Sequence, residues 1–191
     1  MPTPARTSVE EIVDAASRIL DEAGLAGLTM QAVAARVGVR PPSLYKRVRD
    51  RDELLGMIAA ATAGDLGERL TAAAAVASDD PAERLVQLAH ALRAYAHARP
   101  ERYRLVFAPP AETVALDDDA RAVAVRTLLE TTAELVGPDE ALPAARTVTA
   151  WATGFISMEF AGAFRLGGDV DEAFAYGIER IAAALGSGRA R

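Results

Sequence analysis

Apolar residues recur at intervals of three and four along most of the chain, and no stretch alternates apolar and polar residues over the length of a strand. The abundant alanine, leucine, arginine and glutamate residues favour helices, whereas the aromatic residues that favour strands make up only 5% of the chain. The pattern therefore predicts an all-α fold without strands.

Three helices are predicted in the first 52 residues, the second and third of them short. Ser8 and Glu11 have the spacing of a capping box, and the helix that they open runs to Gly24. Thr29 stands at the N-cap of a second helix of about two turns. Pro41-Pro42-Ser43 opens a third, because proline is tolerated in a first helical turn. Two short helices around a glycine-containing turn have the form of a helix-turn-helix.

The rest of the chain predicts a larger antiparallel bundle. Its helices are expected at about 53–76, 81–99, 117–136, 139–166 and 169–185, with a short segment at 101–107 between two prolines. We therefore expect a helix-turn-helix domain at 1–52, a larger helical domain at 53–186, and a flexible tail at 187–191.

Charge is distributed unevenly along the chain. The formal net charge is −6, which disfavours nucleic-acid binding only where it is spread evenly. Between Thr29 and Arg51, six basic residues accompany a single acidic residue, Asp50. The predicted helix-turn-helix therefore carries a local basic patch.

The chain contains no cysteine, which excludes disulfides, thiolate metal sites and a cysteine nucleophile. No apolar run approaches the roughly 18 to 20 residues of a membrane span, and the first residues are not an apolar leader. We expect a cytoplasmic protein without a membrane partner.

The most specific motif lies between Thr29 and Leu55. Thr29 opens a helix, and an Ala34-x-x-x-Gly38-Val39 turn follows. A Leu-Tyr dipeptide then precedes basic residues and a helix start of the form Asp50-Arg51-x-x-Leu-Leu55. This segment resembles the N-terminal signature of the tetracycline-repressor (TetR) family. It departs from the signature at Arg47, Val48 and Arg51, where the family more often has histidine, phenylalanine and lysine.

The resemblance implies a DNA-reading surface. The residues predicted to contact DNA are Thr29, Arg40, Pro41, Ser43, Tyr45, Lys46 and Arg47. Hydroxyl and ammonium groups can donate hydrogen bonds to phosphate oxygens, and the resemblance implies this role for Thr29, Tyr45 and Lys46. The residues at the start of the third helix would instead face base edges. The alternative is a solvated basic turn with Tyr45 packed on the first helix. Arg36 and Arg49 are interpreted as solvated.

A second resemblance lies between Trp151 and Phe164. This stretch is similar to the C-terminal domain named for a Trp-His-Gly signature within TetR-type regulators, with Thr153 in place of the histidine.

Two apolar stripes run along the predicted penultimate helix, which must therefore be buried on more than one face. One stripe would line the core of the chain, and the other would seal a twofold homodimer together with the last helix. The predicted interface residues are Ile156, Phe160, Phe164, Phe174, Ile178 and Ile181. The alternative is a thick monomeric bundle.

The family resemblance also implies a site for a small, largely apolar ligand. The predicted lining residues are His90, Leu92, Tyr103, Phe107, Trp151, Phe155 and Met158. His90, Arg93 and Glu159 would form a polar corner of such a cavity. The alternative is that the Trp151, Phe155 and Met158 stripe belongs to an ordinary core.

No feature of the chain predicts catalysis. His90 and His97 are seven residues apart, beyond the i, i+4 spacing of a helical metal pair, and no phosphate loop or nucleophile elbow is present. We expect no metal and no cofactor.

The resemblance implies a repressor that binds a palindromic double-stranded operator as a homodimer and is released by a small-molecule ligand. The alternative is a helical small-molecule-binding or scaffolding module without DNA activity.

Overall fold

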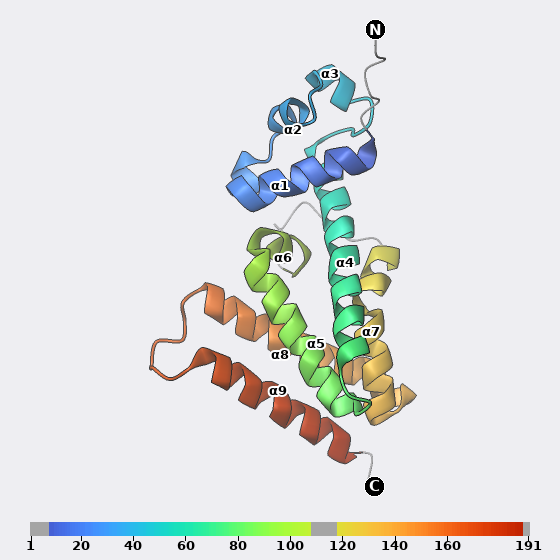
Figure 1. Ribbon diagram of the computed structural model, residues 1–191, viewed down its shortest axis with the longest axis vertical. Helices are drawn as coiled ribbons and strands as arrows, with labels where there is room; N and C mark the ends of the chain where they lie inside the picture. The colour runs from blue at the N-terminus through green and yellow to red at the C-terminus, as the bar shows by residue number, and fades with distance from the viewer. Residues whose placement is uncertain (1–7, 108–117, 189–191) are drawn as a thin grey trace. The chain divides into compact units, whose positions relative to one another are not determined.

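The computed structural model describes residues 8–107 and 118–188, and its regular elements in these ranges are all helices (Figure 1). They are α1 (Val9–Gly27), α2 (Met30–Arg36), α3 (Pro41–Leu44), α4 (Arg51–Val76), α5 (Pro81–Ala98), α6 (Pro100–Phe107), α7 (Asp118–Val136), α8 (Pro138–Phe160) and α9 (Val170–Ser187). The predicted all-α fold is confirmed. Within the described ranges, no helix has the length and the apolar character needed to cross a membrane.

The chain divides into two compact units, each with its own apolar core. The N-terminal unit comprises Met1–Gly64 and Arg99–Arg121, and the C-terminal unit comprises Asp65–Ala98 and Ala122–Arg191. The first turns of α4 and the whole of α6 thus belong with the helix-turn-helix, beyond the border at residue 52 expected from the sequence.

Local capping explains where the first helices begin and end. Ser8 and Glu11 form the predicted capping box, with each side chain accepting a hydrogen bond from the other residue's backbone N–H. Thr29 caps α2, because its Oγ1 accepts from the Ala32 N–H at 3.1 Å. Gly24 has a φ of 64°, which interrupts the helical backbone of α1 one turn before its end at Gly27.

The core of the N-terminal unit joins α1, α2, α3, the start of α4 and α6. Leu20, Leu28, Val33 and Leu44 are buried there together with Leu105 of α6. Helix α6 is also held by charge. The Arg102 guanidinium donates to both oxygens of Asp21 on α1, at 2.9 and 2.6 Å. Helix α6 is therefore an integral part of the unit that carries the helix-turn-helix.

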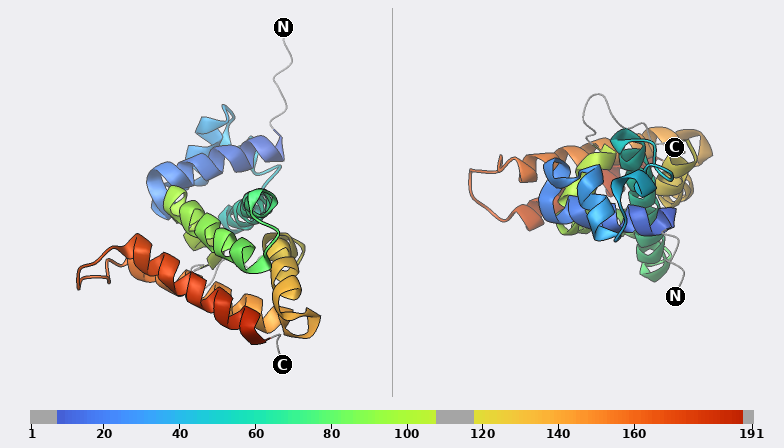
Figure 2. Two further views of the ribbon diagram at one scale, coloured as in Figure 1. Left: turned by 60° about the horizontal axis from the view of Figure 1, so that its bottom comes forward. Right: turned by 90° about the horizontal axis from the view of Figure 1, so that it is seen from above.

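In the C-terminal unit, α5 packs beside α8 and α9, and these last two helices run antiparallel (Figure 2). Phe174 of α9 is fully buried at the centre, where its ring meets those of Trp151 and Phe155 on α8 at centroid distances of 5.0 and 5.2 Å. Leu85 of α5 and Ile178 of α9 complete the core.

Helix α8 is shorter than expected, ending at Phe160 rather than near residue 166. Gly162 has a φ of 61°, and the Ala163 N–H bonds back to the Met158 carbonyl at 2.9 Å, which is a glycine-based helix end. The expectation that Phe164 lies on this helix is therefore wrong. Phe164 belongs to the connection to α9, where it is partly exposed.

We expect the close approach of α8 and α9 at Gly177 to make alanine costly there. A Cβ at this position would lie 2.3 Å from Cζ2 of Trp151, so Gly177→Ala should lower the free energy of unfolding by about 1 to 3 kcal/mol. Gly56→Ala on α4 is the matched control, because a Cβ there meets nothing within 4 Å and alanine gains up to about 1 kcal/mol in helix propensity. Urea unfolding followed by circular dichroism measures both. Equal stability of the two variants would contradict the packing described.

Candidate nucleic-acid interface and pocket

The seven residues predicted to contact DNA are all exposed, at the N-caps of α2 and α3, on α3 and in the turn that follows α3. Beneath them, Leu44 and Val48 are buried in the core of the unit, which fixes the position of the short α3. Tyr45 is 52% exposed, so its ring is not packed away, as the alternative interpretation required. These side chains form a surface that is free to meet a partner.

Not every basic residue near α3 is available to a partner. Arg36 donates to both carboxylate oxygens of Glu22 on α1, with its Nη1 at 2.9 Å from Oε1 and its Nη2 at 2.5 Å from Oε2. This hydrogen-bonded pair lowers the pKa of Glu22. Arg36 thus ties α2 to α1 and is not simply solvated.

Two further arginines lie where α4 begins, Arg49 in the turn before it and Arg51 as its first residue. The Nε of Arg49 lies 2.8 Å from Asp50 Oδ2, and the other oxygen of Asp50 accepts from the Glu53 N–H at the start of α4. Arg51 donates to the backbone carbonyls of Leu28 and Leu25, at 2.8 and 2.6 Å. Arg51 therefore secures the link between α1 and α2, a structural role that sequence reasoning missed.

The other three basic residues of this region are Arg40, Lys46 and Arg47. Their side chains are exposed and form no ion pair with any residue in the described part of the chain. Arg40 is the N-cap of α3 but makes no side-chain capping bond. Thr29 uses its oxygen to cap α2, which leaves its hydroxyl hydrogen to donate outward. The surface thus offers cationic and hydroxyl donors, which suit phosphate oxygens.

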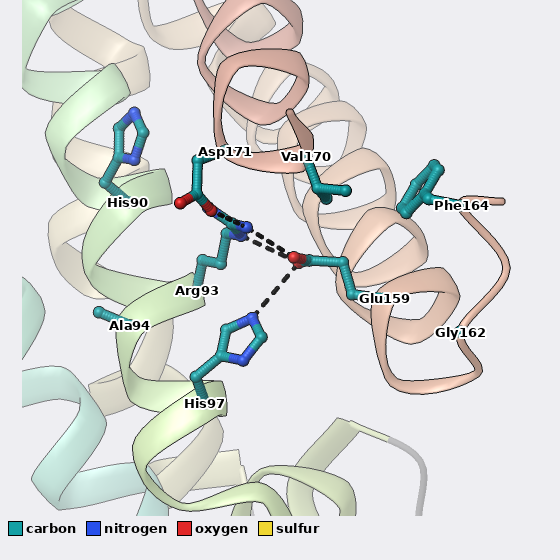
Figure 3. A pocket seen from close by; sticks show the side chains of 9 residues that line it. All are labelled: His90, Arg93, Ala94, His97, Glu159, Gly162, Phe164, Val170 and Asp171. Atoms are coloured by element: carbon teal, nitrogen blue, oxygen red, sulfur yellow. Dashed lines mark hydrogen bonds and ion pairs between the residues drawn. The ribbon is translucent and has the colours of Figure 1, made fainter. Parts of the chain in front are cut away.

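A pocket of about 620 Å³ lies within the C-terminal unit. One wall is a face of α5, and the other is formed by the end of α8, the connection after it and the start of α9 (Figure 3). Its lining residues are His90, Arg93, Ala94, His97, Glu159, Gly162, Phe164, Val170 and Asp171. The volume falls within the range of small-molecule sites, about 300 to 1,000 Å³.

Arg93 stands at the centre of an ion-pair network that links α5 to α8 and α9 (Figure 3). Its guanidinium donates to both oxygens of Glu159, at 2.9 and 2.6 Å, and to Oδ1 of Asp171 at 2.6 Å. His97 Nε2 lies 3.5 Å from Glu159 Oε2. Burial opposes the charge on Glu159, but the hydrogen bonds and the positive charge of Arg93 outweigh it and lower the pKa of Glu159.

Of the seven residues predicted to line a ligand site, only His90 lines this pocket. Trp151 and Phe155 pack in the core around Phe174. Leu92 is half-buried on α5, and Met158 is exposed on α8. Tyr103 and Phe107 belong to the N-terminal unit, where their rings stack on each other 4.7 Å apart. The polar corner of His90, Arg93 and Glu159, in contrast, is part of the pocket wall.

The residues predicted for a dimer interface occupy different environments. Ile156, Phe174 and Ile178 are fully buried within the single chain, so assigning them to a surface between two chains is wrong. Their apolar stripe serves the core of the C-terminal unit. Phe160 and Ile181 are half-buried, and Phe164 lies at the pocket.

Two polar lining residues, His97 and Asp171, were not among the predicted site residues. The spacing of His90 and His97 contained a signal, because seven residues are two helical turns and place both side chains on one face of α5. No comparable signal links Asp171 to α5, since that contact depends on how α9 packs. Among the described residues, no group of three or more histidine, aspartate or glutamate side chains is arranged to hold a metal ion.

Two family models match the chain. The model described as bacterial regulatory proteins of the tetR family covers residues 6–58, the segment that holds α1, α2 and α3. A model described as a tetracyclin repressor-like C-terminal domain covers residues 85–181, about half of the chain. This description does not mention the Trp-His-Gly signature, so that subtype stays a prediction.

Relatives agree with these models. The HTH-type transcriptional regulator Rv0681 of Mycobacterium tuberculosis is 35% identical over 100 residues, which are 52% of this chain and 45% of that protein. The HTH-type transcriptional regulator YobS of Bacillus subtilis is 25% identical over 91% of this chain and 90% of its own length. The chain spans about half the length of the mycobacterial relatives that it matches.

Solved structures show the same fold. The structure of a TetR variant from Acinetobacter baumannii AYE in complex with minocycline superposes with a TM-score of 0.71 at 24% identity, over 97% of this chain and 99% of that one. A protein from Rhodococcus sp. RHA1 gives a TM-score of 0.80 at 22% identity, over 96% and 99% of the two chains. With both of its domains matched, the chain belongs to the TetR family of bacterial regulatory proteins.

Proposed function

We propose that this chain is a DNA-binding transcriptional repressor that binds a palindromic operator as a homodimer and is released by a small ligand. The observation that carries the proposal is that some basic side chains around α3 are paired within the chain and others are not. Arg36, Arg49 and Arg51 are held by partners within the chain, whereas Arg40, Lys46 and Arg47 are exposed without an ion pair among the described residues.

These three side chains differ in what they can contact. Arg40 immediately precedes α3, the helix that would enter the major groove, and its planar guanidinium can donate two hydrogen bonds to a guanine edge. Lys46 and Arg47 follow α3 and suit phosphate oxygens on the flanking backbone. Thr29 and Tyr45 add neutral hydroxyl donors on the same surface.

A dimer follows from the form of the proposed operator, because a single helix-turn-helix reads only one half-site. The exposed faces of α8 and α9 are the surfaces that we propose for pairing. On α8 they carry small residues, Ala150, Gly154 and Ser157, and on α9 the 65% exposed Tyr176. Small side chains let helices approach closely, and the face is separate from the buried stripe of Ile156.

Release by a ligand requires a second state that the ligand favours. Helix α5 carries four lining residues of the pocket and ends at Ala98, with one residue between it and the start of α6 at Pro100. Helix α6 is bound to α1 through Arg102 and Asp21. A shift of α5 would thus reach the helix-turn-helix along the chain. The relative from Acinetobacter, which was solved with minocycline, supports a small-molecule effector.

We expect Lys46→Ala to weaken binding to every operator sequence and to reduce the log–log salt slope by about one unit for each lysine that contacts a phosphate. Tyr45→Phe should weaken binding equally uniformly without changing the slope. Arg49→Ala is the matched control, since Asp50 already neutralises that arginine. Fluorescence anisotropy at several salt concentrations measures all three. A slope change for Arg49→Ala as large as that for Lys46→Ala would contradict the assignment.

Replacing Arg40 should have a different effect. We expect Arg40→Ala to cost about 1 to 3 kcal/mol at one base pair of each half-site and to relax sequence preference there. A selection from operators carrying every single-base change measures that preference. A uniform loss on all sequences would show that Arg40 contacts the backbone instead.

The proposed pairing surface is tested by Gly154→Leu. A Cβ at Gly154 meets nothing within 4 Å in the single chain, so the variant should fold, and leucine favours the helix more than glycine does. Between two chains, the larger side chain should prevent close approach and lower operator affinity by more than about tenfold. Sedimentation equilibrium gives the oligomeric state, with Glu130→Leu on the exposed face of α7 as the control. An unchanged dimer would exclude this face.

A further inference from the structure

The pocket in the C-terminal unit has a charge balance that restricts what it can bind. Arg93 is the lining residue that carries a permanent positive charge, and it is opposed by the carboxylates of Glu159 and Asp171. Burial and the charge of Arg93 lower the pKa of His90, which keeps that imidazole neutral at pH 7. Arg93, Glu159 and Asp171 together therefore carry a net charge of −1.

Arg93 is poorly placed to receive an anion. Both oxygens of Glu159 accept from its guanidinium, and the two side chains are only 13% and 8% exposed. An anionic ligand would have to displace a buried carboxylate or lie beside it unpaired, and both arrangements are costly.

Asp171, in contrast, is open to a ligand. Its side chain is 81% exposed, and Oδ1 alone is engaged by Arg93, so Oδ2 has no hydrogen bond from any described residue. Glu179 adds a further negative charge that acts on His90. Arg165, on the connection after α8, donates to the Gly162 carbonyl and is not a lining residue.

The remaining wall is apolar and aromatic. Phe164 and Val170 face the pocket from the connection and the start of α9, and Ala94 and Gly162 leave room between the walls (Figure 3). A carboxylate at one end of the pocket and an aromatic ring at the other favour a cation that also carries apolar groups, because the carboxylate attracts the charge and the ring packs against the apolar part.

We propose that this pocket binds an organic monocation with an aromatic or alkyl group, the charge beside Asp171 and the apolar part against Phe164. This ligand class rests on the proposed effector-controlled function and replaces the largely apolar ligand that the sequence suggested. A cation that engages Oδ2 of Asp171 shares the charge of that carboxylate with Arg93, and so weakens a contact that joins α5 to α9.

The test is calorimetric titration of the full chain, without DNA, with three probes of similar shape: benzyltrimethylammonium, 3-phenylpropanamide and 3-phenylpropionate. The cation should bind most tightly and the anion most weakly. Asp171→Asn should weaken cation binding about threefold to fivefold, the range for a solvent-exposed charge pair. Glu172→Gln is the matched control, because it removes the same charge from the next residue, which does not line the pocket.

Tighter binding of 3-phenylpropionate, no cation binding, or equal effects of Asp171→Asn and Glu172→Gln would overturn the proposal. Operator affinity, measured separately with and without benzyltrimethylammonium, tests the proposed release independently of the proposed ligand class. Cation binding with the expected charge order but unchanged operator affinity supports the ligand class and rejects release by it. Intact operator binding without any cation binding rejects the ligand class alone.

Discussion

Pairing of charges within the chain determines what each surface can offer to a partner. Around α3, Glu22 holds Arg36 and two backbone carbonyls hold Arg51, and these contacts join α1, α2 and α4. Arg49 pairs with its neighbour Asp50. An arginine engaged in this way has some of its N–H donors occupied before any phosphate binds. The cations without such partners are therefore the ones that define the proposed DNA surface, although six basic residues are clustered there in the sequence.

The same constraint shapes the pocket of the C-terminal unit. Arg93 joins α5 to α8 and α9 through Glu159 and Asp171, so its charge is matched inside the unit. Two carboxylates and one arginine therefore line the pocket, although an arginine in a cavity would by itself suggest a site for an anion. The proposed release depends on the chain connection between α5 and α6, since α6 is bound to Asp21 of α1.

Periodicity and capping residues predicted the helices well, because Ser8, Thr29 and Gly24 act through neighbours in the sequence. The contacts that depend on packing between distant segments were harder to predict. An apolar stripe shows that a face is buried but not by what, so Ile156 and Phe174 were assigned to a partner chain although they fill their own core. Likewise, no local pattern shows that Arg51 caps carbonyls 23 and 26 residues away, or that Asp171 meets Arg93.

The most direct test of the account is the salt dependence of operator binding by the unmodified protein. If Lys46 and Arg47 of both protomers each neutralise one phosphate, four counterions are released, and the slope of log K against log salt should be about −3.6 or steeper. Anisotropy titrations at constant pH over a range of salt concentrations give this slope. A slope shallower than about −2 would contradict the claim that the unpaired cations around α3 bind the DNA backbone.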